Sequence, residues 1–153
     1  MKKGLTLKRA MQHALLPRMT QQEQAIGNAL VMAVLDLPEG EIQVDHFLWA
    51  GCYARTCLVK AGEVIAGALI KIPTIVIVQG VCKVVVGSKV ELIEGYKVLK
   101  GMDGRRQFFS ALEDTYITML FATNAKTVEE AEKEFTDEWQ LLTNNREELC
   151  QVS

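Results

Sequence analysis

The spacing of hydrophobic positions changes twice along this chain and predicts a helix on each side of a β-rich middle. Thr20 and Glu23 form a capping-box pattern, and the apolar residues that follow recur at helical intervals, which predicts a helix over residues 20–36. The same Thr-x-x-Glu pattern begins at Thr127, again followed by apolar residues at helical intervals among many glutamates. A second helix is therefore predicted over about residues 128–149.

Between the two helices the pattern is that of short strands. Residues 42–122 contain runs rich in Val, Ile and Thr, separated by turn signals that include Gly80 and Gly95. The predicted strands are Ile42 to Trp49, Tyr53 to Lys60, Val64 to Ile72, Ile75 to Gln79, Val81 to Val86, Lys89 to Ile93, Tyr96 to Lys100, Arg105 to Ser110 and Thr115 to Phe121. Short strands at such regular spacing favour a β-sandwich or a β-barrel.

Alternation within two of these strands predicts one buried face. Cys82, Val84 and Val86 occupy every second position of one strand. In the next strand Val90 and Leu92 alternate with charged residues. Both patterns are expected for strands that turn one side to a core and the other to solvent.

The length of 153 residues, of which 49% are hydrophobic, fits one globular domain over residues 20–153, preceded by a basic arm over residues 1–19. Pro17 stops the arm's helical spacing. We predict that the arm contacts an acidic partner surface or an apolar groove through Lys2, Lys3, Leu5, Leu7, Lys8, Arg9 and Met11. The alternative is a solvated terminus.

Charge and apolar content narrow the function classes. With 17 Lys and Arg against 19 Asp and Glu, the net charge of -2 does not favour binding to nucleic acid. No apolar run reaches the roughly 18 to 20 residues that a membrane span needs, since charged residues such as Lys60 and Lys71 interrupt the most hydrophobic region. The four cysteines form no CxxC pair, so reduced structural thiols in a cytosolic compartment are expected.

Candidate catalytic and binding residues are few. Around the two histidines, His13 and His46, the sequence shows no nucleophile-base arrangement with an orienting acid, so no catalytic residue is predicted. Arg105 and Arg106 follow a turn and are possible contacts for a phosphate or a carboxylate. Strand alternation sends these two side chains to opposite faces, so an ordinary solvated turn is the alternative.

Several short motifs follow one another along residues 40–142. They are His46-Phe47, Gly51-x-Tyr53-x-Arg55, Ala61-Gly62, Gly80 and Ala111-Leu112-Glu113-Asp114-Thr115. Their order and spacing resemble the cupin family, and more closely the small cupin-like proteins encoded by tailed bacteriophages. The resemblance implies a mainly β, cupin-like (RmlC-like) jelly-roll barrel with N-terminal and C-terminal helices.

The same resemblance indicates that the family's metal ligands are missing. In metal-binding cupins a first motif supplies two histidines and a glutamate, and a second motif supplies a further histidine, a donor set that suits a first-row divalent metal. Here residues 68–76, the window of the first motif, hold none of these ligands, and Gln107 stands at the position of the second-motif histidine. We therefore predict no metal, no cofactor and neither oxygenase nor isomerase chemistry.

These observations lead to the hypothesis of a non-catalytic phage structural or accessory protein, such as a capsid decoration or another virion component. It would reside in the virion or the host cytoplasm, form a homo-oligomer and contact other phage structural proteins through its arm and its barrel surface. Two alternatives stay open. One is a metal-free small-molecule binder that uses the barrel cavity, and the other, less favoured, is a metal-dependent cupin enzyme with nonstandard ligands.

Overall fold

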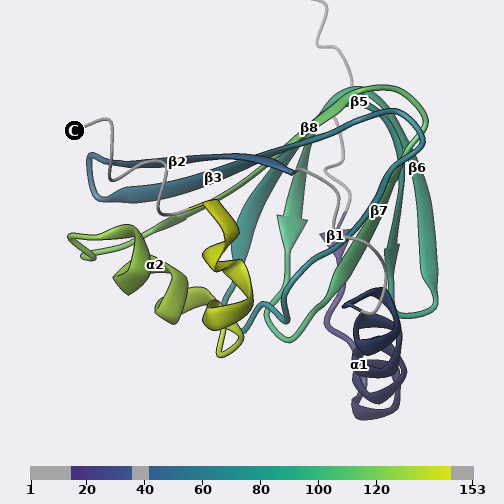
Figure 1. Cartoon of the computed structure of the whole chain (residues 1–153), viewed down its shortest axis with the longest axis horizontal. Helices are drawn as coiled ribbons and strands as arrows, with labels where there is room; N and C mark the ends of the chain where they lie inside the picture. Colours follow the sequence, from purple (N-terminus) through teal and green to yellow (C-terminus); the bar gives the residue numbers. More distant parts are fainter. Residues whose placement is uncertain (1–14, 36–41, 146–153) are drawn as a thin grey trace, which may run out of the picture.

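The structure, a computed structural model, describes residues 15–35 and 42–145, and this part of the chain is mainly β (Figure 1). Its elements in chain order are β1 (Leu15–Leu16), α1 (Gln21–Leu35), β2 (Gln43–Trp49), β3 (Cys52–Val59), β4 (Val64–Ala66), β5 (Thr74–Val86), β6 (Lys89–Gly101), β7 (Gln107–Ala111), β8 (Thr115–Ala122), α2 (Val128–Phe135) and the 3-10 helix η1 (Trp139–Asn145). The predicted partner-binding residues of the arm, Lys2 to Met11, lie outside the described residues.

The strands form one curved sheet with the order β1-β6-β5-β8-β3-β2. β7 pairs with the second half of β5 and with β4, and all pairings are antiparallel except that of β1 with β6. Among the described residues no pairing joins β1 to β2, so the sheet is not closed. Figure 1 shows α2 and η1 beneath β2 and β3, while α1 lies at the other side of the molecule, below β5 and β6.

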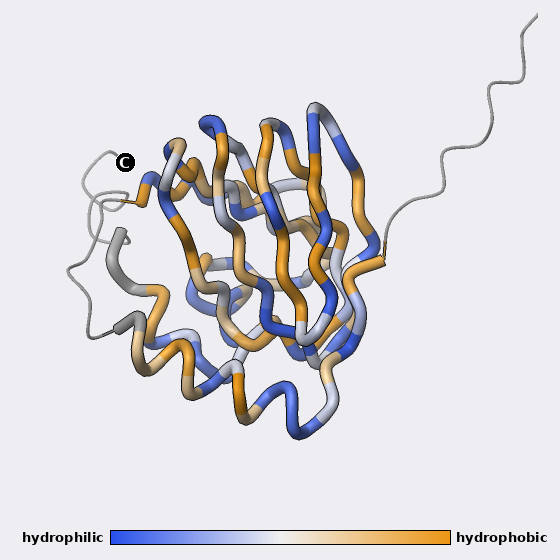
Figure 2. The backbone as a smooth tube through the Cα atoms, turned by 90° about the vertical axis from the view of Figure 1, so that its right-hand side faces the viewer, coloured by the Kyte–Doolittle hydropathy of each residue, from blue (hydrophilic) through white to orange (hydrophobic). Residues whose placement is uncertain are grey.

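The core lies inside the curved sheet and contains residues of β1, β3, β5, β6, β7, β8 and α2. Alternate residues of β5 are buried, namely Val76, Val78, Cys82, Val84 and Val86. The burial of Cys82, Val84 and Val86 was predicted from the sequence pattern. From α2, Ala131 and Phe135 reach into the same core and are 0% and 1% exposed. Figure 2 shows hydrophobic residues concentrated along the strands and hydrophilic residues near the turns that join them.

In β6 the buried face is the opposite of the one that its sequence indicates. Val90 and Leu92 are 60% and 56% exposed, whereas Ile93 and Leu99 are buried. The prediction of a buried face for Val90 and Leu92 is therefore wrong. The register decides the matter, because β6 pairs with β5 from end to end and Ile93 lies opposite the buried Cys82.

Gly80 and Gly95 lie inside long strands, so the turns predicted at these residues are wrong. The two glycines are partners in the β5–β6 register. Gly80 has a φ of 147°, and a Cβ atom there would lie 2.4 Å from Thr115 Oγ1. The absence of a side chain lets β5 bend at this point and change its neighbour from β8 to β7.

The strand predicted over Val64 to Ile72 is shorter in the structure and ends at Ala66. The backbone beyond it still bonds to the neighbouring segment, because the Gly67 N–H donates to the Gln107 carbonyl at 2.8 Å. Gly67 has no side chain to pack in a strand. Its backbone lies so close to this segment that a Cβ atom at Gly67 would be 3.0 Å from the same carbonyl oxygen.

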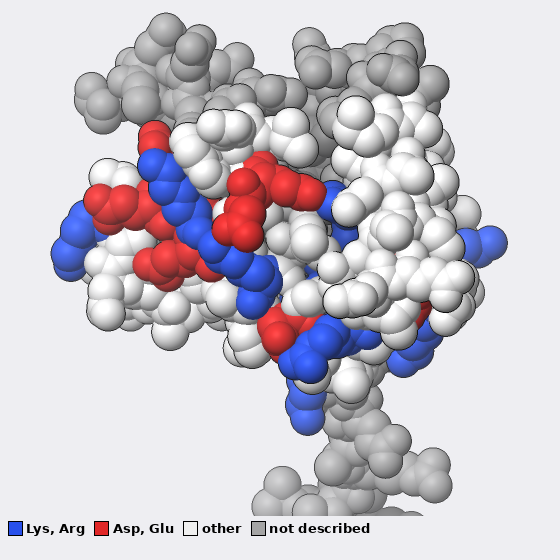
Figure 3. Space-filling view, turned by 90° about the horizontal axis from the view of Figure 1, so that it is seen from below, with Lys and Arg blue, Asp and Glu red and all other residues white. Residues whose placement is uncertain are grey.

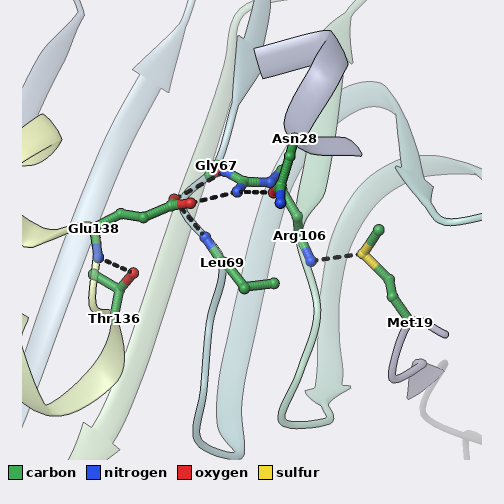
Figure 4. Close-up of polar contacts among 7 residues, drawn as sticks. All are labelled: Met19, Asn28, Gly67, Leu69, Arg106, Thr136 and Glu138. Atoms are coloured by element: carbon green, nitrogen blue, oxygen red, sulfur yellow. Dashed lines mark hydrogen bonds and ion pairs between the residues drawn. The ribbon is translucent and has the colours of Figure 1, made fainter. Parts of the chain in front are cut away.

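The single helix predicted over about residues 128–149 is broken in the structure. α2 ends before Thr136, which has extended backbone and whose N–H donates to the Glu132 carbonyl at 3.1 Å. The chain then turns before η1 begins. This break places the side chain of Glu138 beside that of Arg106 (Figure 4).

Residues 15–19, at the end of the arm predicted over residues 1–19, pack against the sheet and its core. Leu15 and Leu16 form β1 instead of a helical turn and pair in parallel with the end of β6. Leu16 is 2% exposed and Met19 is 5% exposed, so both belong to the core. The only described part of the predicted arm is thus a structural element.

The helix predicted over residues 20–36 is confirmed by α1. Thr20 Oγ1 accepts a hydrogen bond from the Glu23 N–H, and the Glu23 carboxylate accepts one from the Thr20 N–H, both at 3.2 Å. The same carboxylate accepts a bond from the Ser88 N–H at 2.8 Å, which ties α1 to the β5–β6 turn. The backbone bonds from Thr20 and Ser88 hold the pKa of Glu23 below its ordinary value.

Candidate functional site

A buried ion pair joins α2 to the inner face of the sheet. Arg55 Nη1, on β3, donates to Glu132 Oε1, on α2, at 3.3 Å. The side chain of Glu132 is 0% exposed and that of Arg55 is 14% exposed. Because a single buried charge is strongly destabilising, each side chain depends on the other, and the pair fixes α2 against β3.

An aromatic cluster fills the space beside this ion pair. The fully buried ring of Tyr53 stacks on Phe135 with centroids 6.2 Å apart and meets Phe121 edge-on at 5.6 Å. The Tyr53 hydroxyl lies 2.7 Å from His46 Nδ1. His46 thus holds the polar end of a core tyrosine, which is a structural role.

The described cysteines, Cys52, Cys57 and Cys82, are free thiols. Burial raises the pKa of the Cys57 thiol, although the charge of Arg55 acts in the opposite direction, and burial raises the pKa of Cys82 as well. A thiol whose pKa is raised is mostly protonated at neutral pH and is a poor nucleophile. This supports the prediction of structural thiols for Cys57 and Cys82.

A second buried ion pair, between Arg106 and Glu138, connects four segments of the chain (Figure 4). Arg106 Nη2 donates to Glu138 Oε1 at 2.5 Å and Nη1 donates to Oε2 at 2.9 Å, which is the bidentate geometry of a strong charge-assisted contact. Nη2 also donates to Asn28 Oδ1 on α1 at 2.8 Å, and Nη1 to the Gly67 carbonyl at 3.0 Å. Glu138 Oε2 accepts a further bond from the Leu69 N–H at 3.0 Å.

The electrostatics of this second pair favour the ionised carboxylate. Partial burial of Glu138 opposes ionisation, but the hydrogen bonds from Arg106 and from the Leu69 N–H outweigh it, and the pKa of Glu138 lies below its ordinary value. The Arg106 side chain is 2% exposed, and its Nε is buried without a hydrogen-bond partner among the described residues. Glu138 therefore supplies the only anionic partner of Arg106 in the described part of the chain.

Arg105 is fully buried and has only neutral hydrogen-bond acceptors among the described residues. Its Nη2 donates to Thr74 Oγ1 at 2.6 Å, its Nη1 to the Met102 carbonyl at 2.6 Å and its Nε to Gln107 Oε1 at 3.2 Å. Burial lowers the pKa of Arg105 to about 10, although the charge of Asp103 acts in the opposite direction. The side chain remains a cation at neutral pH.

The predicted anion contacts, Arg105 and Arg106, lie in separate networks that share no hydrogen-bonding residue. This agrees with the strand alternation that sends them to opposite faces. Arg106 does bind a carboxylate, but it is that of the protein's own Glu138. Binding of an external anion by either arginine stays a prediction.

Neither Glu132, which is buried, nor Glu138, which is partly buried, is among the site residues that the sequence predicted. A signal for Glu132 was present, since it follows Val128 by four residues and precedes Phe135 by three, which places it on the apolar side of α2. Glu138 gave no such signal, because it lies outside regular helix and its partner is 32 residues away in sequence.

The side of the sheet that faces away from α2 is rich in exposed hydrophobic side chains, and we call it the outer sheet face. The register of β2, β3, β8, β5 and β6 places its residues in three rows across these strands. The first row is Phe47, Ala54, Leu120, Ile75 and Lys100, the second is Asp45, Thr56, Thr118, Ile77 and Val98, and the third is Gln43, Leu58, Tyr116, Gln79 and Tyr96. Trp49, 73% exposed, extends the face along β2, and Phe47 and Tyr96 are each 60% exposed. Large exposed apolar surfaces of this kind mark interaction sites.

Charged groups of both signs are mixed on the face of the molecule seen in Figure 3. Such mixing does not create the one-sign field that attracts nucleic acid. None of the helices in the described part of the chain is long and apolar enough to span a membrane.

Comparison with known proteins shows the fold. No family model and no curated protein matches the sequence. Among solved structures, similarity is found to a cupin 2 conserved barrel domain protein from Salinispora arenicola (14% identity, TM-score 0.48, 56% of this chain and 79% of that chain) and to KdgF from Halomonas sp. (19%, 0.47, 57% and 84%). Salicylate 1,2-dioxygenase from Pseudoaminobacter salicylatoxidans is 12% identical with a TM-score of 0.50, over 74% of this chain and 34% of that chain. The chain is mainly β with a cupin-like jelly-roll fold, as predicted.

These neighbours do not decide the function, because they include an enzyme and the identities are low. A divalent metal does not fit the residues at the positions where metal-binding cupins carry their ligands. Gln107 and Thr74 offer neutral oxygen atoms, and both are bonded to the Arg105 guanidinium, which repels a cation. Among the described residues, no three His, Cys, Asp or Glu side chains come together as a metal site.

Proposed function

We propose that this chain is a non-catalytic structural or accessory protein that acts through protein-protein contacts, and specifically a component of a tailed-phage virion such as a capsid decoration. The observation that carries this proposal is the contrast between the two faces of the sheet. Polar side chains beneath the inner face, such as Arg55 and Arg105, are bonded to other residues of the chain, whereas large hydrophobic side chains are exposed on the outer sheet face.

The inner face supports the non-catalytic part of the proposal. Tyr53, Arg105, Glu132 and Phe135 are each at most 1% exposed. An enzyme must bring its substrate to its reactive groups, usually in a concave pocket with convergent polar side chains. Here the polar side chains converge on one another and hold α2 and β7 in place.

The outer sheet face supports the protein-protein part. Aromatic residues are enriched at protein interfaces and charged residues are depleted from their centres. Phe47, Trp49, Tyr96 and Tyr116 supply four exposed aromatic rings on this face, each at least 50% exposed. The phage assignment itself is supported by the motif order over residues 40–142.

Mass spectrometry of purified virions tests the phage assignment. We expect the chain in particles that have been purified on a density gradient, at a copy number comparable to other virion proteins. A phage enzyme from the same lysate serves as the control for carry-over. If the chain is absent from such particles, the virion part of the proposal is wrong.

The second candidate is a metal-free binder of a small molecule, favoured by the polar side chains of His46 and Arg55, which are only partly buried beneath the sheet. A thermal-shift screen with sugars, nucleotides and small carboxylic acids tests it. A ligand that raises the melting temperature of the wild type but not of Arg55→Met would support this candidate over the structural role. The absence of any shift would remove it.

A further inference from the structure

The outer sheet face carries two charged residues within its three rows, and they lie on the two outermost of its five strands. Asp45 is on β2, the first of the five strands, and Lys100 is on β6, the last. Between them the same rows hold aliphatic, aromatic, threonine and glutamine side chains. Neither charged side chain has an ion pair among the described residues. The face is therefore uncharged in the middle, acidic on one side and basic on the other.

The geometry points to a second copy of this chain as the partner of the outer sheet face, with the same face of both copies packed together around a two-fold axis. This inference deepens the proposed function by naming one partner. It goes beyond the virion assignment, because self-association is measured on the isolated protein.

Charge complementarity selects a second copy as the occupant. A two-fold axis that lies in the interface and runs roughly along β8, the middle strand, exchanges the β2 side of one copy with the β6 side of the other. Asp45 of each copy then faces Lys100 of the other. The two residues lie in neighbouring rows, which is an offset of about 7 Å along the strands. A rotation of the two sheets relative to each other, about 30° in aligned sheet packing, brings the two residues closer to the same level.

The size of the face is sufficient for such a dimer. Seven residues on each of β2, β3 and β8 and five on each of β5 and β6, at about 3.3 Å per residue and a strand spacing of about 4.8 Å, give roughly 490 Å² per copy. The two copies together would bury about 1,000 Å², which is the lower limit for a specific interface. At its centre the interface would place Leu120 and Thr118 of β8 beside their own symmetry mates.

Charge reversal tests the inference by sedimentation equilibrium on the full chain over a range of concentrations. We expect a dimer for the wild type. Asp45→Lys and Lys100→Asp each place like charges across the interface and should raise the dimer Kd at least about tenfold, and the double variant Asp45→Lys/Lys100→Asp should restore it to within about threefold of the wild type. Asp137→Lys, an exposed reversal on the α2 side, should leave the Kd unchanged.

Cross-linking gives a second measurement that does not depend on tolerance of a reversed charge. Facing residues of two packed sheets lie about 10 Å apart, which is beyond the reach of a disulfide but within the reach of a bismaleimide linker. The Asp45→Cys/Lys100→Cys variant should therefore give intermolecular bismaleimide cross-links that neither single variant gives, because the two copies of one substituted residue lie on opposite sides of the interface, about 19 Å apart. A wild type that remains monomeric at about 100 µM, a dimer that the two reversals leave intact, or a double variant that is not restored would each overturn the inference. Any of these results leaves the virion test untouched, and absence from virions leaves the dimer untouched.

Discussion

Replacing Glu138 by glutamine is expected to destabilise this protein substantially although the residue is not in regular helix. The carboxylate accepts three hydrogen bonds, two from Arg106 and one from the Leu69 N–H, and it is the counter-ion of an arginine that is 2% exposed. Breaking a buried pair costs about 3–5 kcal/mol, and hydrogen bonds to charged groups contribute about 1.5–3 kcal/mol. Because the Glu138 side chain is 28% exposed, we expect a smaller loss of about 2–3 kcal/mol in the free energy of unfolding.

The assay is urea denaturation at pH 7, with the m-value as a check that the denatured state is unchanged. The neighbouring residue supplies the control, since Asp137 pairs with Lys71 at 2.6 Å but the two side chains are 88% and 42% exposed. Exposed pairs contribute little, so Asp137→Asn should unfold close to the wild type. If Asp137→Asn and Glu138→Gln lose the same stability, burial of the pair is not the reason for its strength.

A double substitution separates the pair from its surroundings. Glu138→Leu leaves Arg106 buried without an anion, whereas Arg106→Leu/Glu138→Leu removes both charges. The double variant should therefore be more stable than Glu138→Leu alone. Additive losses in this cycle would show that the two side chains contribute independently.

Three further predictions follow from single contacts. The folded-state pKa of Glu138 is lowered, so its contribution to stability is complete above the unfolded pKa of about 4.3 and is lost as the pH falls through the folded pKa. The stability difference between wild type and Glu138→Gln should therefore shrink in urea titrations below about pH 4. A difference that stays constant down to pH 2 would argue against ionisation as its cause. Gly80→Ala should lower the melting temperature far more than Gly62→Ala, since both glycines have positive φ but only Gly80 lacks room for a Cβ atom, and equal effects would leave backbone strain as the whole explanation. Phe135→Ala should cost about 3–5 kcal/mol in the same urea assay, whereas Leu141→Ala, at a residue 52% exposed, should cost less than about 1 kcal/mol. A similar loss for both would mean that burial does not determine the loss at these two residues.

Local patterns in the sequence predicted the elements whose stability is local. The capping box at Thr20 marks the start of α1, and the alternation of Cys82, Val84 and Val86 identifies the buried face of β5. Both signals act over a few residues, because a cap satisfies adjacent N–H groups and alternation follows from the pleat of one strand. The predicted fold class depended on the same short strands and was correct.

The errors occurred where a distant segment decides the local structure. Gly80 looks like a turn residue, but β8 and β7 hold the chain extended on both sides of it. Leu16 looks like part of a helical arm, but the end of β6 takes it into the sheet. For Val90 and Leu92 the pattern identified alternation correctly, and the register with β5 determined which side was buried.

The candidate sites divide in the same way. From the sequence came the opposite directions of Arg105 and Arg106, because strand periodicity alone determines them. Only the tertiary structure brought Glu138 to Arg106 and Glu132 to Arg55, and only the strand order placed Asp45 and Lys100 on the two outermost strands of the outer sheet face. Those contacts join residues far apart in the chain, so their energies depend on burial and register, which no local pattern encodes.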